Sequence, residues 1–432
     1  MLDSLSLNPF KFSDAGKKKS SPFGFHMLKK GNNLFDGVTG AQASCSISGA
    51  RWGIVNGVVT QFAANEPRIE DDGFGACPAF TQLAKYTEDL TNAVWSRPNI
   101  LTPVLAGTFQ GMNIWDCSES TATAYHSIIQ NQFVGVGDNS VIGMAFVAKA
   151  KNRKLYIDVR FKNNTYPGTR INLENMAIEV VGGAIAHNIK NMGNGYCLVF
   201  IAYNVGAGSY DPYIAIQLYN GVSSQYTGDG VSGVYLGQPT YINFGVNGIP
   251  FIPPYIPNNT GSSVSVVSEA GNTSFDLDLP VLSRFNKGLR GPLAQGRIEV
   301  EVESNVDSER LPSGITTNLN IFTVGNNIVI GALYFQKTST GALNVGIYDG
   351  TNNPYIVIGT LMVGQTFRIS IDYGTYTDGS QKMRLTVNGV KSSVVAFSGS
   401  FGTHNLKFFY GALLHAFFIK LGSFRFIPKP IW

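Results

Sequence analysis

Many short strand-like segments, several of them with alternating apolar and polar residues, are the feature of this sequence that most limits its fold. Between residues 95 and 283 they include VIGMAFVAKA, KLYIDVRF, YCLVFIAYNV and YIAIQLYN, divided by turn clusters such as VGDNS and KNNTYPGT. The segments recur about every 10 to 20 residues with almost no helical periodicity. This pattern predicts an antiparallel β-sandwich over 95–283, and the lack of a fixed-period repeat argues against a β-helix or propeller.

A second set of strand-like segments follows a Gly/Pro-bearing linker at 284–295. It begins with RIEVEVE, in which Ile298, Val300 and Val302 alternate with charged residues, as in a strand with one buried and one solvent-exposed face. The pair Asn388-Gly389 inside MRLTVNGVK is typical of a tight hairpin turn with positive φ. We therefore expect a second sandwich over 296–427, followed by a short tail at 428–432.

Residues 41–94 are expected to form lead-in hairpins and a short turn, because SCSISGARWGIV and GVVTQFA alternate and are divided by Gly and Asn. The composition agrees with an all-β chain, since it is rich in Gly, Phe and Tyr. Charged residues make up only 14% of the chain, well below the usual quarter, which suits a protein that buries much of its surface in an assembly.

Positive charge is concentrated at the N-terminus. Residues 1–30 hold six Lys and two Asp, a net +4 that equals the net charge of the whole chain. The run Lys17, Lys18 and Lys19 lies among Gly, Ser and Pro, so residues 1–40 are expected to be an extended basic arm that docks on other subunits. No aromatic platform accompanies the run, and binding to nucleic acid is not expected.

The cysteines and the hydropathy pattern carry further expectations. Cys45, Cys77, Cys117 and Cys197 are far apart and have no Cys-x-x-Cys pairing, which indicates free, partly buried thiols in a reducing cytoplasm, with a pair of disulfides as the alternative. Residues 1–30 contain no continuous apolar stretch of the kind a secretory signal needs, and no apolar run is long enough to span a bilayer.

Catalytic and metal-binding patterns are weak in this sequence. Acidic residues occur as local pairs such as Glu88-Asp89, and nothing places two of them across a groove as a glycosidase would need. The five His lie near no nucleophile motif. Asp349, Asn352 and Asn353 are a calcium candidate, although a plain Asp-Gly turn is the favoured interpretation. We expect no enzyme, no cofactor and no metal.

Two separate stretches resemble modular tail and minor structural proteins of bacteriophages and prophages. The first runs from Asn65 to Trp95 and includes KYTEDLTNAVW; the second, YIPNNTGSSV, begins at Tyr255. The matching positions are Asn65, Pro67, Arg68, Tyr86, Glu88, Asp89, Asn92, Ala93 and Trp95, and then Tyr255, Ile256, Pro257, Thr260, Gly261, Ser262 and Val264. The resemblance implies a carbohydrate-binding-module-like jelly roll followed by a concanavalin A-like or laminin G-like sandwich. The segments MRLTVNG and GQTFRISI resemble two strand motifs of the second kind of sandwich.

This resemblance implies a structural component of a tailed-phage virion (tail, fibre or capsid decoration), assembled in the host bacterial cytoplasm. Its partners would be further copies of itself, with a trimer as the candidate, and other virion proteins, but no membrane. Ile431 and Trp432, together with the lysine run, are the candidate assembly residues. The alternatives are a lectin-type receptor-binding protein and, third, a polysaccharide depolymerase.

Sugar sites on sandwiches combine a stacking aromatic ring with side chains that bond hydroxyl groups. Trp115, Asp116 and Tyr125 lie in a segment expected between strands and are the candidate glycan-binding residues, with host-surface polysaccharide as the candidate ligand. The competing interpretation places Trp115, like Trp95, in the core.

Overall fold

The computed structural model describes residues 27–30, 33–36, 49, 51–66, 68–71, 73–75, 77–131, 133–266, 277–278, 295–304, 319–324, 332–338, 342–359, 364–398, 405–408 and 420–427. These residues form 33 strands and no helix, so none of them belongs to a helix that could cross a membrane. The chain divides into two compact units, one of Phe80–Val266 with Gly57–Thr60 and the other of Val267–Trp432 with Met1–Asn56 and Gln61–Ala79. The predicted fold class, an all-β chain of two antiparallel sandwiches, is confirmed.

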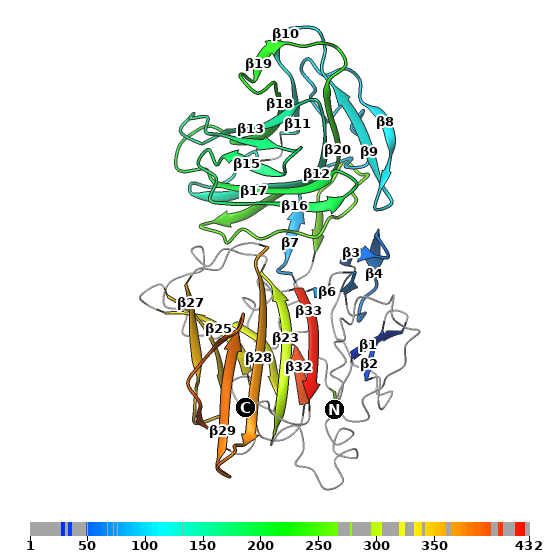
Figure 1. Ribbon diagram of the computed structural model, residues 1–432. Coiled ribbons are helices and arrows are strands. Elements are labelled where there is room, and N and C mark those ends of the chain that lie inside the picture. Colours follow the sequence, from blue (N-terminus) through cyan, green and yellow to red (C-terminus); the bar gives the residue numbers. More distant parts are fainter. Residues whose placement is uncertain are drawn as a thin grey trace. The chain divides into compact units, whose positions relative to one another are not determined.

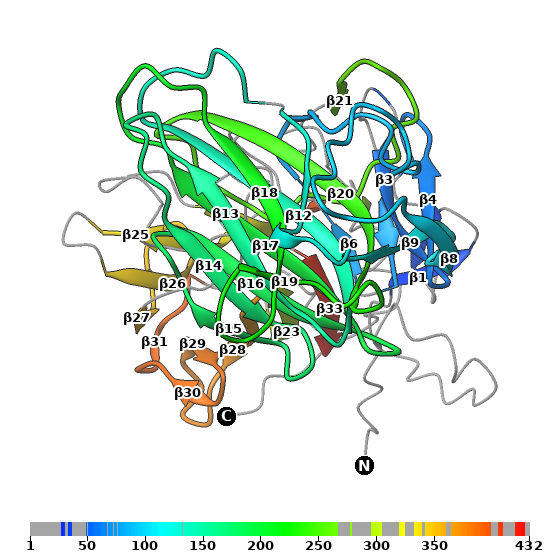
Figure 2. The same ribbon diagram turned by 90° about the horizontal axis from the view of Figure 1, so that it is seen from above.

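The Phe80–Val266 unit is a jelly-roll sandwich of two antiparallel sheets (Figure 1), which Figure 2 shows from a second direction. The five-stranded sheet has the order β11 (Ser127–Ile129), β18 (Tyr213–Tyr219), β13 (Lys154–Arg160), β14 (Gly168–Asn172), β15 (Ala177–Val180). The six-stranded sheet has the order β16 (Ala186–Gly193), β17 (Tyr196–Asn204), β12 (Ser140–Lys151), β20 (Gly233–Val246), β9 (Met112–Ser118), β8 (Val104–Phe109). Two short ribbons, β10 (Thr123–Tyr125) with β19 (Gln225–Thr227) and β7 (Phe80–Gln82) with β21 (Val264–Val266), complete the unit.

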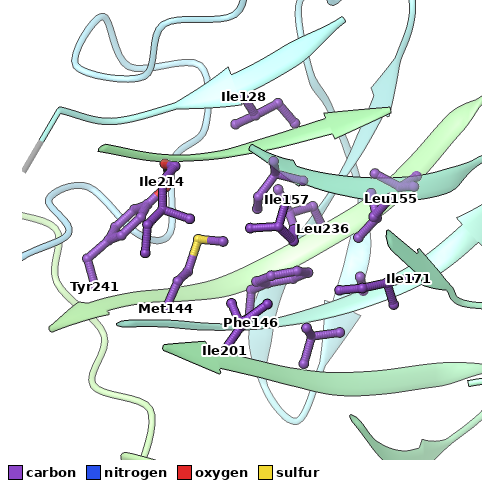
Figure 3. Packing of buried hydrophobic residues seen from close by; sticks show 14 of the residues in the cluster. Ile128, Met144, Phe146, Leu155, Ile157, Ile171, Ile201, Ile214, Leu236 and Tyr241 are labelled. Atoms are coloured by element: carbon purple, nitrogen blue, oxygen red, sulfur yellow. The ribbon is translucent and has the colours of Figure 1, made fainter. Parts of the chain in front are cut away.

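The core of this unit lies between the two sheets. Figure 3 shows Ile128, Leu155, Ile157, Ile171 and Ile214 of the five-stranded sheet facing Met144, Phe146, Ile201, Leu236 and Tyr241 of the six-stranded sheet. Each is at most 2% exposed, and burial of one such side chain stabilises the fold by about 1.5–3 kcal/mol.

Alternation along β13 decides what the five-stranded sheet shows to solvent. Leu155, Ile157 and Val159 are fully buried, while the residues between them are half-buried and point outward. β18 pairs with β13 from Lys154↔Tyr219 to Arg160↔Tyr213, so its outward side chains stand beside those of β13. This outer face carries the candidate site.

The second unit is also a sandwich of two antiparallel sheets. One has the order β22 (Leu277–Asp278), β32 (Asn405–Phe408), β24 (Leu319–Val324), β25 (Ala332–Lys337), β26 (Leu343–Tyr348), β27 (Tyr355–Gly359). The other has the order β30 (Val390–Lys391), β29 (Gln381–Val387), β28 (Thr366–Thr375), β23 (Gly296–Glu303), β33 (Lys420–Ile427), β6 (Gly73–Gly75), β5 (Ile69–Glu70), with β31 (Val395–Ala396) beside β29. As the sequence indicates, β23 alternates buried and half-buried residues, and Asn388 (φ 48°) and Gly389 (φ 86°) form the turn after β29.

The domain boundaries differ from those expected. The predicted lead-in at 41–94 is divided between the units: β6 pairs with β33, whereas β7 pairs with β21 and the amide of Leu83 donates to the carbonyl of Tyr241. The jelly roll therefore begins at Phe80 rather than at residue 95, and it ends at Val266 rather than at residue 283. Two further hairpins are β1 (Met27–Lys30) with β2 (Asn33–Asp36) and β3 (Arg51–Val55) with β4 (Val58–Phe62). The first lies within residues 1–40, so this part of the predicted arm is a hairpin and not extended. The predicted linker, apart from residue 295, and the tail at 428–432 lie outside the described residues.

Candidate functional site

A groove of about 590 Å³ lies on the outer face of the five-stranded sheet. Its volume falls within the range of sites that bind small molecules or segments of a polymer. The lining residues are Pro98, Asn99, Ala124, Tyr125, Ser127, Ile129, Tyr156, Asp158, Tyr166, Tyr213, Ala215, Gln217, Ser224 and Gln225. Four tyrosines and several hydroxyl, amide and carboxylate groups therefore meet in one depression.

Strand register places the floor residues side by side. Tyr156 and Asp158 are successive outward residues of β13, and Gln217 of β18 pairs with Tyr156. The partner of Asp158 is Ala215, whose small side chain leaves space above the sheet. A floor built on paired strands is held by backbone hydrogen bonds, so the polar groups on it are fixed in position before a ligand arrives.

Asp158 is the charged centre of the groove. Its Oδ2 accepts hydrogen bonds from the hydroxyl of Tyr213 at 2.9 Å and from Nε2 of Gln217 at 3.2 Å. Burial raises the pKa of the Asp158 carboxyl above its ordinary value, and the Tyr213 hydrogen bond opposes that rise. The pKa of Tyr213 is raised as well, first by burial and then by the charge of Asp158. The hydroxyl of Tyr213 therefore donates to an Asp158 side chain whose orientation it holds.

The aromatic rings of the groove stand at different depths. Tyr125 and Tyr166 are about half exposed, at 49% and 48%. The ring of Tyr166 is tilted against that of Tyr213, with centroids 6.4 Å apart and planes at 56°. The ring of Tyr156 lies across Gly168 of β14, where a β-carbon would come within 1.9 Å of the tyrosine Cζ. Such rings offer apolar faces edged by polar groups, the combination on which sugar rings stack.

The rim at Tyr125 is held by the residues around it. The side-chain amide of Asn99 donates to the carbonyl of Tyr125 at 2.8 Å, and β10 pairs with β19 at Tyr125↔Gln225. Behind the rim, the buried ring of His126 contacts the carbonyl oxygen of Asn99 through Nδ1 at 2.8 Å and that of Tyr226 through Nε2 at 3.3 Å. His126 is thus a buried, hydrogen-bonded residue that supports the rim.

Of the three residues predicted to bind glycan, the structure places Tyr125 in the groove and the other two elsewhere. Trp115 is 9% exposed and belongs to the core, so its ring is not available as a stacking face. Asp116 forms an ion pair with Lys151 at 2.6 Å and accepts a hydrogen bond from Ser118. The expectation is corrected because residues 112–118 form strand β9, not a loop, and neighbouring side chains on a strand point to opposite faces.

The groove residues that the sequence analysis missed are Tyr156, Asp158, Tyr166, Tyr213 and Gln217. A signal for four of them is present in KLYIDVR and YIAIQLY. Once the apolar residues of these strands are assigned to the core, Tyr156, Asp158, Tyr213 and Gln217 must face outward. What the alternation does not reveal is that the two strands are neighbours.

Several other candidates have structural roles. Asp349 is 3% exposed; its Oδ1 accepts from the amides of Thr351 and Asn352, and its Oδ2 accepts from the amide of Ser398. The carboxylate thus organises a turn, and no cluster of metal-ligating side chains occurs among the residues that the structure describes. Cys77, Cys117 and Cys197 are buried, and burial raises the pKa of the Cys197 thiol to about 12; Cys45 lies outside the described ranges.

The assembly candidates Lys17, Lys18, Lys19, Ile431 and Trp432 all lie outside the described residues.

The two stretches behind the phage resemblance contact each other inside the jelly roll. The hydroxyl of Tyr255 donates to Glu88 and to Thr87, and the amide of Thr87 donates to the carbonyl of Asn258 at 2.7 Å. The indole of Trp95 is 1% exposed and donates to the carbonyl of Tyr86 at 3.1 Å. Glu88 is therefore part of the scaffold, and hydrogen bonds between these stretches connect the N-terminal end of the unit with its C-terminal end.

Comparisons with known proteins give low similarities. No family model matches the chain, and no curated protein matches it. One similar solved structure is the CBM22-1 xylan-binding domain from Paenibacillus barcinonensis Xyn10C, with 14% identity and a TM-score of 0.24, covering 38% of this chain and 92% of that one. Another is the mouse laminin alpha1 chain, domains LG4-5, with 10% identity and a TM-score of 0.16, covering 71% of this chain and 80% of that one. Similarity at this level leaves the role of the groove to be judged from its own geometry.

Proposed function

We propose that the Phe80–Val266 unit binds a glycan in the groove on its five-stranded sheet. The observation that carries this proposal is the meeting of four tyrosines with Asp158 and Gln217 on one rigid face. Rings of this kind stack on the apolar faces of sugars, while the carboxylate and the amide bond their hydroxyl groups.

A single acidic residue lines the groove, which favours binding over hydrolysis. Glycosidases use two carboxyl groups that flank the scissile bond, and Asp158 has no acidic neighbour among the lining residues. We therefore propose a non-catalytic module. Incubation of the full chain with a polysaccharide that it binds, followed by measurement of new reducing ends, tests this; their appearance would favour the depolymerase alternative.

A glycan microarray probed with the full chain tests the binding proposal, followed by titration calorimetry on the best ligand. Tyr125→Ala removes an exposed ring at the rim, so the fold should survive while affinity falls about 2- to 10-fold. Tyr355→Ala is the matched control, because Tyr355 is similarly exposed at 54% but belongs to the other sandwich. The proposal fails if no glycan binds, or if the two variants lose affinity equally.

We also propose, from the sequence resemblance, that this module is a structural component of a bacteriophage virion that acts by assembly with its own copies and with other virion proteins. The two stretches that carry the resemblance are in contact within this unit, through the bonds of Tyr255 to Glu88 and of Thr87 to Asn258. The test is the solution mass of the full chain beside a form that lacks residues 1–40. An oligomer that dissociates without the arm supports the proposal, and a monomer in both cases contradicts self-assembly through the arm.

A further inference from the structure

The charge and hydrogen-bonding character of the groove restrict which glycans it can accept, and this inference rests on the proposed glycan binding. Asp158 is the only charged side chain among the lining residues. Its two hydrogen bonds both end on Oδ2, so Oδ1 remains free as an acceptor within the part of the chain that the structure describes.

Gln217 supplies a second unsatisfied acceptor on the floor. Its side chain is 7% exposed, its Nε2 is used by Asp158, and its Oε1 is buried with no hydrogen-bond partner in the described residues. A buried polar atom without a partner is costly, and a ligand that donates a hydrogen bond there removes the cost. Both free polar atoms of the floor therefore require donors from the ligand.

The cations of the same sheet face lie beside the groove without lining it. Arg160 donates through Nε to the carbonyl of Asp211 at 2.9 Å, and its guanidinium stacks on Tyr213. Lys154 is paired with Glu179, and Arg170 stacks on Tyr219 with 5.7 Å to the ring centroid. None of these three residues lines the groove, so no cation in the lining offsets the charge of Asp158.

We infer that the groove selects uncharged, hydroxyl-rich glycans and rejects glycans that carry carboxylate or sulfate groups. Sugar hydroxyls donate to Asp158 Oδ1 and Gln217 Oε1, whereas an anionic substituent brings only acceptors. A negative group held within a few ångströms of Asp158 is also repelled, by an amount that corresponds to about tenfold or more in affinity at a partly buried site.

The experiment compares polysaccharides that share a backbone and differ in charge. Affinity electrophoresis and calorimetry of the full chain are run with matched pairs: dextran and carboxymethyl-dextran, hydroxyethylcellulose and carboxymethylcellulose, galactan and sulfated galactan. At low salt the neutral member of whichever pair binds should bind at least about tenfold more tightly, and added salt should narrow the difference by screening the repulsion.

Two variants separate the charge from the hydrogen bonds. Asp158→Asn removes the charge, so the preference for the neutral member should shrink several-fold. Gln217→Leu removes an acceptor but keeps the carboxylate, so neutral binding should weaken while the rejection of the acidic member persists. The variants test different atoms, and each is checked for native folding by its near-ultraviolet circular dichroism.

The outcomes distinguish this inference from the proposed function. If a glycan binds in the groove but the acidic member binds equally or better, the inference is overturned and the proposed function stands. If no member of any pair binds and the microarray is also empty, both are overturned.

Discussion

The hydroxyl of Tyr213 donates a hydrogen bond to Oδ2 of Asp158 over 2.9 Å, between neighbouring strands of one sheet. The two residues are diagonal neighbours, because Asp158 is directly opposite Ala215 in the β13–β18 register. The small side chain of Ala215, opposite Asp158, leaves space beside the bond. The bond fixes the orientation of the one carboxylate in the groove, and it joins the aromatic and the charged parts of the site.

Tyr213→Phe should weaken glycan binding without removing the ring. The change leaves Asp158 Oδ2 with only the Gln217 donor, and a hydrogen bond to a charged group contributes about 1.5–3 kcal/mol. We expect about tenfold lower affinity by titration calorimetry. Since the Tyr213 bond lowers the pKa of Asp158, its loss should also move the pH dependence of binding to higher pH.

Tyr219→Phe is the matched control for this change. Tyr219 is on the same strand and the same face, but it does not line the groove, and its hydroxyl lies 3.5 Å from Nη1 of Arg170. Equal loss of affinity in both variants would show that the Tyr213–Asp158 bond has no special part in binding.

Asp158→Asn should make the jelly roll more stable at neutral pH but not at acidic pH. Burial raises the pKa of Asp158 in the folded state, so its contribution to stability is fully present below the unfolded-state pKa and is lost as pH rises through the folded-state pKa. At neutral pH the variant should therefore unfold at a higher urea concentration than the wild type. At a pH below the ordinary pKa of an aspartate the gain should vanish.

Asp229→Asn in the same unit provides a control of opposite sign. Hydrogen bonds from Ser232 lower the pKa of Asp229, so its contribution to stability is present above the unfolded-state pKa and is lost as pH falls. This variant should lose stability at neutral pH. If both variants shift in the same direction at neutral pH, then burial of Asp158 does not govern its ionisation.

Much of the sandwich architecture could be predicted, because its long strands appear in the sequence either as alternating segments, such as β13, or as continuous apolar runs, such as β12. VIGMAFVAKA, KLYIDVRF and YCLVFIAYNV coincide closely with β12, β13 and β17. Short strands such as β11 and β14 were not predicted, because three to five residues are too few to show a recognisable alternation.

The groove could be predicted only in part, because it depends on pairing between distant strands. Tyr156 and Gln217 are 61 positions apart in the chain and meet through the register of β13 with β18. Trp115 was wrongly predicted to bind sugar, because it is followed by an acidic residue, Asp116. Both residues belong to β9, and this strand places the Trp115 ring in the core. Local composition identifies the kinds of residue, whereas the topology decides which of them share a face.

Trp115→Phe should leave glycan binding unchanged and affect only the core. Trp115 packs among buried residues, and its Nε1 has no hydrogen-bond partner within the described residues, so the substitution removes an unsatisfied donor while it opens a small cavity. These effects oppose each other, and we expect a loss of stability of no more than about 1–2 kcal/mol by chemical denaturation. A large loss of affinity with an intact fold would instead restore Trp115 as a binding residue.

Gly168→Ala should weaken binding through the ring of Tyr156 at little cost in stability. A β-carbon at Gly168 would come within 1.9 Å of Cζ and the hydroxyl oxygen of Tyr156, so the ring must leave the sheet surface. Loss of one stacking face corresponds to about 0.5–1.5 kcal/mol, or roughly 2- to 10-fold in affinity. Alanine also restricts the unfolded chain more than glycine does, which offsets the contacts that Tyr156 loses within the fold.

Gly261→Ala is the control, because its nearest neighbour would be the Tyr86 hydroxyl at an ordinary 3.6 Å. Calorimetry measures the affinity of the two variants, and thermal unfolding measures their stability. Lower affinity with unchanged stability in Gly168→Ala alone would show that the Tyr156 ring contacts the ligand. Unchanged affinity would mean that this ring only covers β14.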